Sequence, residues 1–440
     1  MTPCKESQAT TNCRAFTSVS NPLDKNSQND SQIFGQYSGQ PSKSKLIGSL
    51  TFSSPASFPS LWLHQIGLAF YNLLKVSKFR ARRCYEVFWH ELSMDPRVRL
   101  SPWSEPVENQ KKLATFEIFY LRFLRVYCVF GHLILLRYLY GSVLGEVKIA
   151  TILWTLSSTT AAGISITAGI HRLWCHNSYK AKWPARLLFG IIFSSTAQYS
   201  ILNWAKDHRV HHKYSDTDAD PHNARRGFFF SHFGWLVTTP HPDVVKRKNE
   251  VYSKDLENDW IVRYQHKYYK PLAFLFCYLI PTMVPSYFWG EDLWIAHTAF
   301  ISRHVVLTNM TASVNSVAHL WGTKPYDKNI LPCDNKFIAC LTYGEGWHNY
   351  HHVYPWDYKA SEFGNYKLNV TKALIDFLAW IGLAYDLKTV PASVVTKRVV
   401  KTRGSSYPDH HEHGGIWGWN DEEMSEKEKN SVLRTYEKQS

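Results

Sequence analysis

Residues 147–176 read VKIATILWTLSSTTAAGISITAGIHRLWCH. Up to Gly169 this stretch is apolar or small, and its single charged side chain is Lys148 near the start. Roughly 20 such residues in a helix cross the hydrocarbon core of a bilayer. The apolar stretch runs directly into His171 and His176, whose imidazole side chains bind metals readily. The sequence therefore predicts a membrane helix that delivers two histidines to the membrane surface.

Three further windows have a similar length and apolarity. They lie at about 123–141, 269–290 and 293–314. With 147–169 they predict an all-α integral membrane protein with four transmembrane helices in two hairpins, closed by the short acidic connectors Ser142–Glu146 and Glu291–Asp292. The apolar run Leu187–Ile201 is shorter, and we interpret it as a buried or interfacial helix. The alternative is a soluble helical protein with very apolar core helices.

Polar side chains within the windows, and charged residues between the windows, indicate how the chain is oriented in the membrane. His132, Arg137, Arg303 and His304 are costly in a bilayer unless they face the bundle interior or reach its surface. The stretch 171–268 carries 15 Lys and Arg against 9 Asp and Glu. The positive-inside rule then puts this stretch and both termini in the cytosol, and the 8 cysteines without a CxxC pair agree with a reducing compartment.

The 21 histidines are clustered rather than scattered. Residues three or four apart share one face of a helix, which joins the side chains of 208, 211 and 212, those of 348, 351 and 352, and those of Asn315 and His319. His171 and His176 are five apart, about 140° around an α-helix, and are expected to flank a site. The remaining histidines outside the tail, including His222 and His232, we interpret as structural.

Nine neutral imidazoles exceed the four ligands of one zinc ion, so two metals fit the count better. Imidazole suits Zn, Cu, Fe and Ni, and the absence of cysteine and methionine ligands argues against Cu(I). A nitrogen-rich site at the edge of a bilayer, reached by apolar substrates, favours iron and dioxygen. The +14 net charge suggests an anionic partner, but nothing in the basic stretch resembles a nucleic-acid recognition motif.

The histidine motifs resemble those of the membrane-bound acyl-CoA desaturases of the stearoyl-CoA desaturase type. Their residues are most similar to those of insect members. The motifs are HRLWCH (171–176), DHRVHHK (207–213), DPHNARRGFFFSH (220–232), NSVAHLWG (315–322) and EGWHNYHH (345–352). The resemblance covers roughly residues 120–385. It divides the chain into a disordered leader (1–60), a cytosolic segment before the membrane (61–122), a desaturase domain (123–385) and a polar cytosolic tail (386–440).

The resemblance implies a di-iron centre inside a cytosolic helical cap. One iron would be held by His171, His176, His208, His212 and His351. The other would be held by His211, His319, His348 and His352, with Asn315 reaching it through a water. Iron and dioxygen would remove two hydrogens from neighbouring methylene groups of a long-chain acyl-CoA. Carboxylates expected to accept the ligands' N–H groups are Asp207, Asp216, Asp220 and Glu345.

The resemblance also implies a set of substrate-binding residues, namely Lys206, Asp207, Tyr199, Thr159, Gly163 and Ala312, and several substrate positions depart from the stearoyl-type pattern. Lys206 stands where an arginine is usual, Tyr199 where an asparagine is common, Thr239-Pro240 where an Arg-Lys pair meets coenzyme A, and Ala312 where a tryptophan forms a wall. Thr159 and Gly163 correspond to the closed end of the acyl tunnel. Because both are small, we expect a tunnel that is deeper or wider than in stearoyl-type enzymes.

The resemblance also implies partners and a location. Electrons are expected from a separate cytochrome b5 and its reductase, because His413-Gly-Gly lacks the proline of a fused heme motif. The expected location is the endoplasmic reticulum membrane, with the metal centre in the cytosol. Two alternatives remain open at this point: a fatty acyl hydroxylase or acetylenase on the same centre, and a membrane iron-binding protein without catalysis.

Overall fold

The computed structural model describes residues 115–362, 366–404 and 415–437, with side chains from Val126 onward. The predicted leader (1–60) and almost all of the predicted pre-membrane segment (61–122) lie outside the described residues. The described part contains all five of the histidine-bearing motifs.

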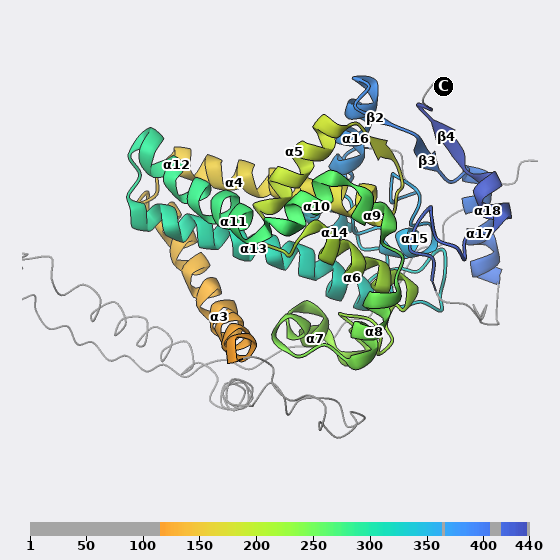
Figure 1. The fold of residues 1–440 in the computed structure, drawn as a ribbon, viewed down its shortest axis with the longest axis horizontal. Helices are drawn as coiled ribbons and strands as arrows, with labels where there is room; N and C mark the ends of the chain where they lie inside the picture. The colour runs from red at the N-terminus through yellow and green to blue at the C-terminus, as the bar shows by residue number, and fades with distance from the viewer. Residues whose placement is uncertain (1–114, 363–365, 405–414, 438–440) are drawn as a thin grey trace, which may run out of the picture. The chain divides into compact units, whose positions relative to one another are not determined.

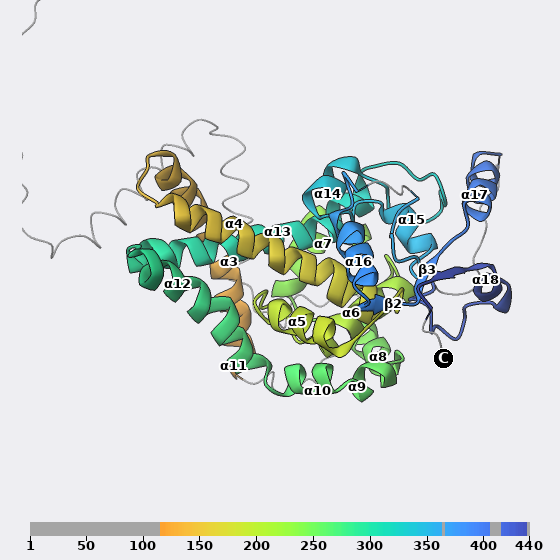
Figure 2. The same cartoon turned by 90° about the horizontal axis from the view of Figure 1, so that it is seen from above.

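A helical bundle occupies one side of the cartoon in Figures 1 and 2. Its elements are α3 (Thr115–Val143), α4 (Ile149–Ile164) continued by the π-helix η3 (Ser165–Cys175), α11 (Tyr269–Ala273), the π-helix η6 (Phe274–Leu279), α12 (Ile280–Trp289) and α13 (Leu293–Leu320). The long helix α13 packs against α3, α4 and α12 and ties the bundle together. All four windows predicted from the sequence are therefore helical.

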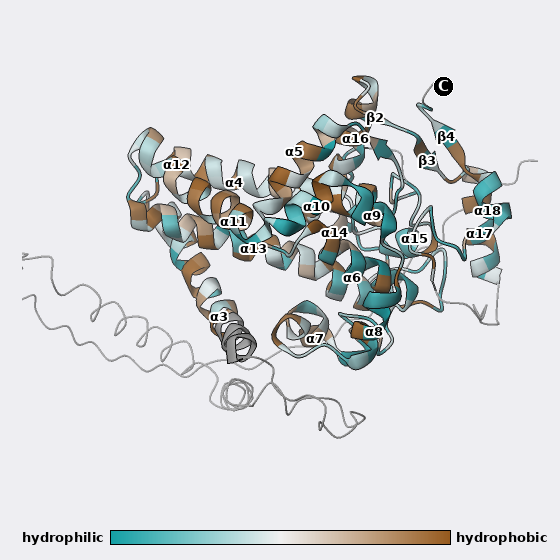
Figure 3. Ribbon diagram, viewed as in Figure 1, coloured by the Kyte–Doolittle hydropathy of each residue, from teal (hydrophilic) through white to brown (hydrophobic). Residues whose placement is uncertain are grey.

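Three stretches among the described residues are long and apolar enough to cross a membrane: Val126–Val143, Ile149–Cys175 and Tyr269–Trp289. Brown, hydrophobic ribbon is prominent on α3, α4, α11 and α12 in Figure 3, whereas α6, α8, α9 and α15 are mainly teal. The fourth window lies in α13, which has sufficient length but is interrupted by polar residues such as Arg303, Asn309 and Asn315. The structure supports a membrane protein, and the count of four spans stays a prediction.

The second predicted acidic connector is tied to the start of α4. The backbone N–H of Lys148, at the start of α4, donates to the Glu291 carboxylate (3.0 Å), and the hydroxyl of Thr151 donates to the same oxygen. The Lys148 ammonium in turn donates to the carbonyl of Trp289 at the end of α12 (2.8 Å). Glu291 thus satisfies the free N–H end of one helix from the connector of another.

The four polar side chains noted within the windows have partners. The predicted condition, that they face the interior or reach its surface, is met. Arg137 pairs with Glu146 (2.6 Å), His132 bonds Asn309 (3.0 Å), Arg303 donates to the carbonyl of Ser195 (2.9 Å), and Tyr127 bonds His304 (2.9 Å). These contacts join α3 to α13 and α13 to the loop after α5, so the costly groups also hold the helices together.

A cap of short helices packs at the end of the bundle. It comprises α5 (Trp183–Ser194), α6 (Ile201–Lys213), η4 (Ala224–Arg226), α7 (Phe228–His232), η5 (Gly234–Val237), α8 (Pro242–Glu250), α9 (Lys254–Asn258), α10 (Trp260–Lys267), α14 (Lys336–Leu341), α15 (His348–Val353) and α16 (Val370–Trp380). Helix α5 covers most of the apolar run Leu187–Ile201. It is a shorter apolar helix that packs on η3 and α10 and leaves Leu188 exposed, in agreement with a buried or interfacial helix.

The segment predicted as a polar tail (386–440) contains helices and strands where it is described. It contains β3 (Leu387–Thr389), α17 (Ala392–Gly404), α18 (Glu426–Ser431) and β4 (Leu433–Thr435). Strand β4 pairs antiparallel with β3, and β1 (Lys180–Ala181) pairs with β2 (Ala384–Tyr385). Figure 1 shows this C-terminal part beside α15, against the cap. The polar composition gave little sign of this, although some of its few large apolar residues, such as Trp417 and Met424, are deeply buried.

Candidate metal centre

Two short helices carry most of the predicted histidine ligands. Helix α6 presents His208, His211 and His212 in its last two turns, and its start is capped by the hydroxyl of Ser200, which accepts the N–H of Asn203. Helix α15 presents His348, His351 and His352. Both histidine triplets therefore lie in helices, as their spacing in the sequence predicted.

His171 and His176 lie closer together than an α-helix would allow. The segment that carries His171 is a π-helix, and the N–H of His176 donates to the carbonyl of His171, five residues earlier (3.2 Å). In a π-helix residues five apart fall on nearly the same side. The two imidazole rings are 4.7 Å apart between centroids. The local π-helix thus replaces the 140° separation of an α-helix, and the two rings flank one group of candidate ligands, as expected.

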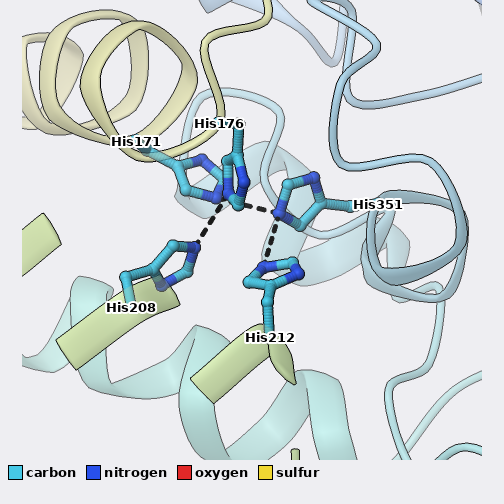
Figure 4. A group of neighbouring side chains, drawn as sticks. All are labelled: His171, His176, His208, His212 and His351. Carbon is cyan, nitrogen blue, oxygen red and sulfur yellow. Dashed lines mark hydrogen bonds between the residues drawn. The ribbon is translucent and has the colours of Figure 1, made fainter. Parts of the chain in front are cut away.

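The structure brings nine histidines together in two groups. The five-histidine group consists of His171, His176, His208, His212 and His351, and the four-histidine group of His211, His319, His348 and His352. Within each group the candidate ligand atoms lie within 4.8 Å of one another. Figure 4 shows the five rings turned toward a common centre, with His208 and His212 rising from α6. Asn315 lies one turn before His319 on α13.

The imidazoles are arranged as neutral ligands. Burial, followed by the neighbouring imidazoles, holds the pKa of His208, His212, His348, His351 and His352 well below the ordinary value for histidine. Their Nε2 atoms face one another, as between His176 and His208 (3.0 Å) and between His319 and His348 (3.0 Å). Convergent neutral nitrogens of this kind fit a bound transition-metal ion, since each offers a lone pair to the same point.

Carboxylates hold the opposite nitrogen of several rings. His211 Nδ1 donates to Asp220 (2.9 Å), His319 Nδ1 to Asp216 (3.2 Å), and His171 Nδ1 lies 2.9 Å from Glu345. A proton fixed on Nδ1 leaves the Nε2 lone pair free for a metal. His211 Nε2 is buried and has no hydrogen-bond partner among the described residues. The donor set therefore fits metal binding at both groups.

The charges of these carboxylates agree with that role. Burial alone would raise their pKa, but His211 and His222 lower the pKa of Asp220, and Arg172 lowers that of Glu345. They stay ionised and act as acceptors. Asp207 differs from the expectation: its carboxylate pairs with Lys248 (2.6 Å), and burial raises its pKa. It therefore holds α8 to α6 rather than a histidine ring.

The partner of His176 comes from the far end of the chain. Its Nδ1 donates to the backbone carbonyl of Trp417, and the N–H of Trp419 donates to the His176 carbonyl (2.9 Å). The Arg209 guanidinium lies 3.9 Å from the centre of the Trp417 ring. Sequence reasoning missed this contact because a backbone carbonyl leaves no signature in side-chain types. The run Ile416-Trp-Gly-Trp419, within a polar segment, was the available signal.

His222, interpreted as structural from the sequence, lies beside the four-histidine group. Its ring is 4.2 Å from that of His211, and its Nδ1 lies 3.4 Å from the second oxygen of Asp220. Burial and the adjacent His211 lower the pKa of His222 to about 3. Asp220 thus lies between the two rings. The DPHN motif, which contains both Asp220 and His222, was the available signal in the sequence.

A cavity of about 200 Å³ extends from the histidines between α13, α3 and η3. Of the predicted substrate residues it is lined by Tyr199, Asp207, Ala312 and Gly163, and also by Asn315. Thr159 and Lys206 are not among its lining residues. At Gly163 the Tyr343 ring lies against the glycine. The expectation of a deeper or wider tunnel stays a prediction, and at this position Tyr343 takes up part of the room that the small residue leaves.

Comparison with known proteins gives consistent matches. The family model described as fatty acid desaturase matches residues 149–361. The acyl-CoA Delta-9 desaturase of Acheta domesticus is 51% identical over 295 residues, which is 66% of this chain and 80% of the relative. The acyl-CoA Delta12-desaturase of the same species is 50% identical over 65% of this chain and 79% of its own length.

A vertebrate relative matches as well. Stearoyl-CoA desaturase 5 of Bos taurus is 48% identical over 257 residues, covering 58% of this chain and 76% of the relative. The region matched by the family model contains the histidine-bearing helices α6 and α15, which agrees with the resemblance drawn from the motifs. The chain therefore belongs to the fatty acid desaturase family, a family of oxidoreductases.

Proposed function

We propose that the chain is an acyl-CoA desaturase that introduces a double bond into a long-chain fatty acyl-CoA at a di-iron centre. The observation that carries the proposal is the pair of histidine groups at the head of a mainly apolar cavity. The five-histidine group would hold one iron and the four-histidine group the other, with Asn315 near the second. Iron is the metal proposed because an all-nitrogen set beside an apolar cavity suits oxygen chemistry on hydrocarbon.

No acid or base of the protein can remove hydrogen from an unactivated methylene group, so the reaction is an oxidation. Its atoms and electrons balance as follows. A –CH2–CH2– unit becomes –CH=CH–, and dioxygen becomes two waters, so two electrons and two protons are needed besides the two hydrogens taken from the chain. The iron ions would supply the oxidising power toward hydrogen on unactivated carbon. The two external electrons would come from cytochrome b5 and its reductase, docked on the cytosolic face of the endoplasmic reticulum membrane.

The residues of this chain would bind, orient and exclude water. Glu345, Asp216 and Asp220 keep the proton of their histidine partners on Nδ1. The cavity between α13, α3 and η3 would take the acyl chain, with Ala312 and Tyr199 in its wall. Lys206 on α6 would meet a phosphate of coenzyme A, as a point charge rather than a two-pronged contact.

The test is expression in a host that lacks its own desaturase. Mass spectrometry would locate any new double bond, and a hydroxylated or acetylenic product would identify the alternative outcomes on the same centre. His208→Ala should abolish the product. The matched control is His241→Asn, which changes a histidine outside both groups and keeps a side-chain cap on α8. Bound iron without any modified acyl chain would overturn the enzymatic proposal and favour a non-catalytic iron protein.

A further inference from the structure

Gly163 and Tyr343 meet at one wall of the cavity. A Cβ atom added at Gly163 would overlap Cε2 of the Tyr343 ring, at a separation closer than carbon atoms can approach. Both residues line the cavity. The ring therefore occupies the space that a side chain on α4 would otherwise fill, and the two residues form one wall between them.

The position of the Tyr343 ring is held by its backbone. Tyr343 has φ +57°, in the left-handed region that non-glycine residues rarely adopt. Its carbonyl accepts two hydrogen bonds from Thr371, from the backbone N–H (3.2 Å) and from the hydroxyl (2.9 Å). The Thr371 hydroxyl also lies 2.7 Å from that of Thr167 on η3. The loop that carries Tyr343 is thus fixed to the continuous helix that carries Gly163 on one side and His171 on the other.

The distance from the histidines indicates which part of a substrate this wall would touch. Gly163 precedes His171 by eight residues, which corresponds to at most about 12 Å along the axis, the value for an α-helix, because most of this stretch is the π-helix η3. Tyr343 is therefore remote from the reacting carbons. It would touch acyl chain beyond them, where a rigid obstacle discriminates between chains more sharply than the affinity of single methylene groups.

We propose that Tyr343 is a specificity-determining residue, which supplies from the loop after α14 the wall that α4 lacks at Gly163. The size of this residue pair then sets which acyl chains fit. This inference rests on the proposed use of the cavity as the acyl channel.

The first test is a competition assay between two acyl-CoA substrates that differ by about four carbon atoms, with both products quantified in one vessel. The ratio of the products does not depend on how much of the enzyme is active. Tyr343→Ala should raise the share of the longer chain by about tenfold, the scale of discrimination by one or two misfitting methylene groups. Tyr343→Phe is the matched control, because it keeps the ring and removes only the long contact to Thr160 (3.4 Å).

The second test is a double-mutant cycle. Gly163→Ala should push the ring into the cavity and shift the ratio toward the shorter chain. The same change in the Tyr343→Ala background should have little effect, since no ring remains to be displaced. Coupling between the two changes supports the inference, and independent effects contradict it.

The outcomes separate the inference from the function on which it rests. A wild-type protein that makes no unsaturated product would overturn the proposed function. Active Tyr343→Ala protein with an unchanged product ratio would overturn the inference alone. If Tyr343→Ala fails to accumulate or loses iron, Tyr343→Leu replaces it, and its product ratio decides by the same criterion.

Discussion

The five-histidine group and the four-histidine group receive their orientation from different parts of the chain. In the first, His171 faces the Glu345 carboxylate and His176 donates to a backbone carbonyl of the C-terminal segment. In the second, two carboxylates of one loop, Asp216 and Asp220, hold His319 and His211. The first group thus depends on a contact to a residue 241 positions away, whereas the second depends on one loop that directly follows α6, the helix of His211.

The groups also differ in how completely they are enclosed. All members of the five-histidine group are buried, and the four-histidine group includes His352, which is partly exposed. Asn315, which lines the cavity, lies one turn before a member of the smaller group. A metal with fewer protein ligands keeps positions for water or dioxygen. The two proposed irons would therefore be held unequally by the protein, and this inequality can be measured.

The largest expected effect comes from neighbouring residues on α6. His211→Ala and His212→Ala should both abolish desaturation, because each removes a ligand of one iron. Iron content should distinguish them: the four-histidine group would keep three ligands and lose its metal, whereas the five-histidine group would keep four and retain part of it. Metal analysis of the purified proteins checks this. Equal iron loss in both variants would contradict the inference that the two histidine groups bind their irons unequally.

Changing the carboxylates should have a smaller effect. Asp220→Asn should weaken iron binding by about 10- to 100-fold, the usual cost of losing a partner that orients a ligand. The loss should fall on one iron per chain, measured by chelator competition. Glu345→Gln should affect the other iron, and it should also lower stability, because Arg172 is buried and would lose its anionic partner. Iron affinity unchanged in both variants would remove the carboxylates from the proposal.

Acid should weaken both groups through their neutral imidazoles. Because burial lowers the pKa of His348 and His351, the folded metal-free chain keeps them uncharged well below pH 6.5, whereas the unfolded chain takes up protons there. The unfolded state therefore binds more protons, and the free energy of unfolding should fall as the pH drops below about 6.5. Thermal unfolding of metal-free protein between neutral and acid pH measures this. A midpoint that rises on acidification would contradict neutral, buried imidazoles.

The smallest expected effect is at the C-terminal contact. A Cβ at Gly418 would lie 2.5 Å from the His176 carbonyl oxygen, so Gly418→Ala should displace the Trp417 carbonyl from His176. Iron should leave the five-histidine group several-fold faster, still below the effect of losing a carboxylate. The matched control is Gly404→Ala, where nothing lies within 4 Å of the new methyl group. Equal iron release in the two variants would show that the contact does not orient His176.

Much of this protein can be predicted from the sequence alone. The apolar windows predicted helices at all four places, since their length and composition are local properties. The spacing of histidines on α6 and α15 placed three rings on one face of each helix. The grouping into five and four came from the resemblance to known motifs, and the structure brings the same residues together. The family was recognisable because its motifs are contiguous in the chain.

Only the tertiary structure decided the contacts that join distant segments. The π-helix that draws His176 to His171 depends on hydrogen bonds that residue types do not reveal. Trp417 reaches His176 through a backbone carbonyl, and Tyr343 fills the space at Gly163 from a loop far along the sequence. Local pattern fixes which residues share a face. Which surface meets that face is set by packing of the whole chain, because close packing allows a space to be filled from any segment that reaches it.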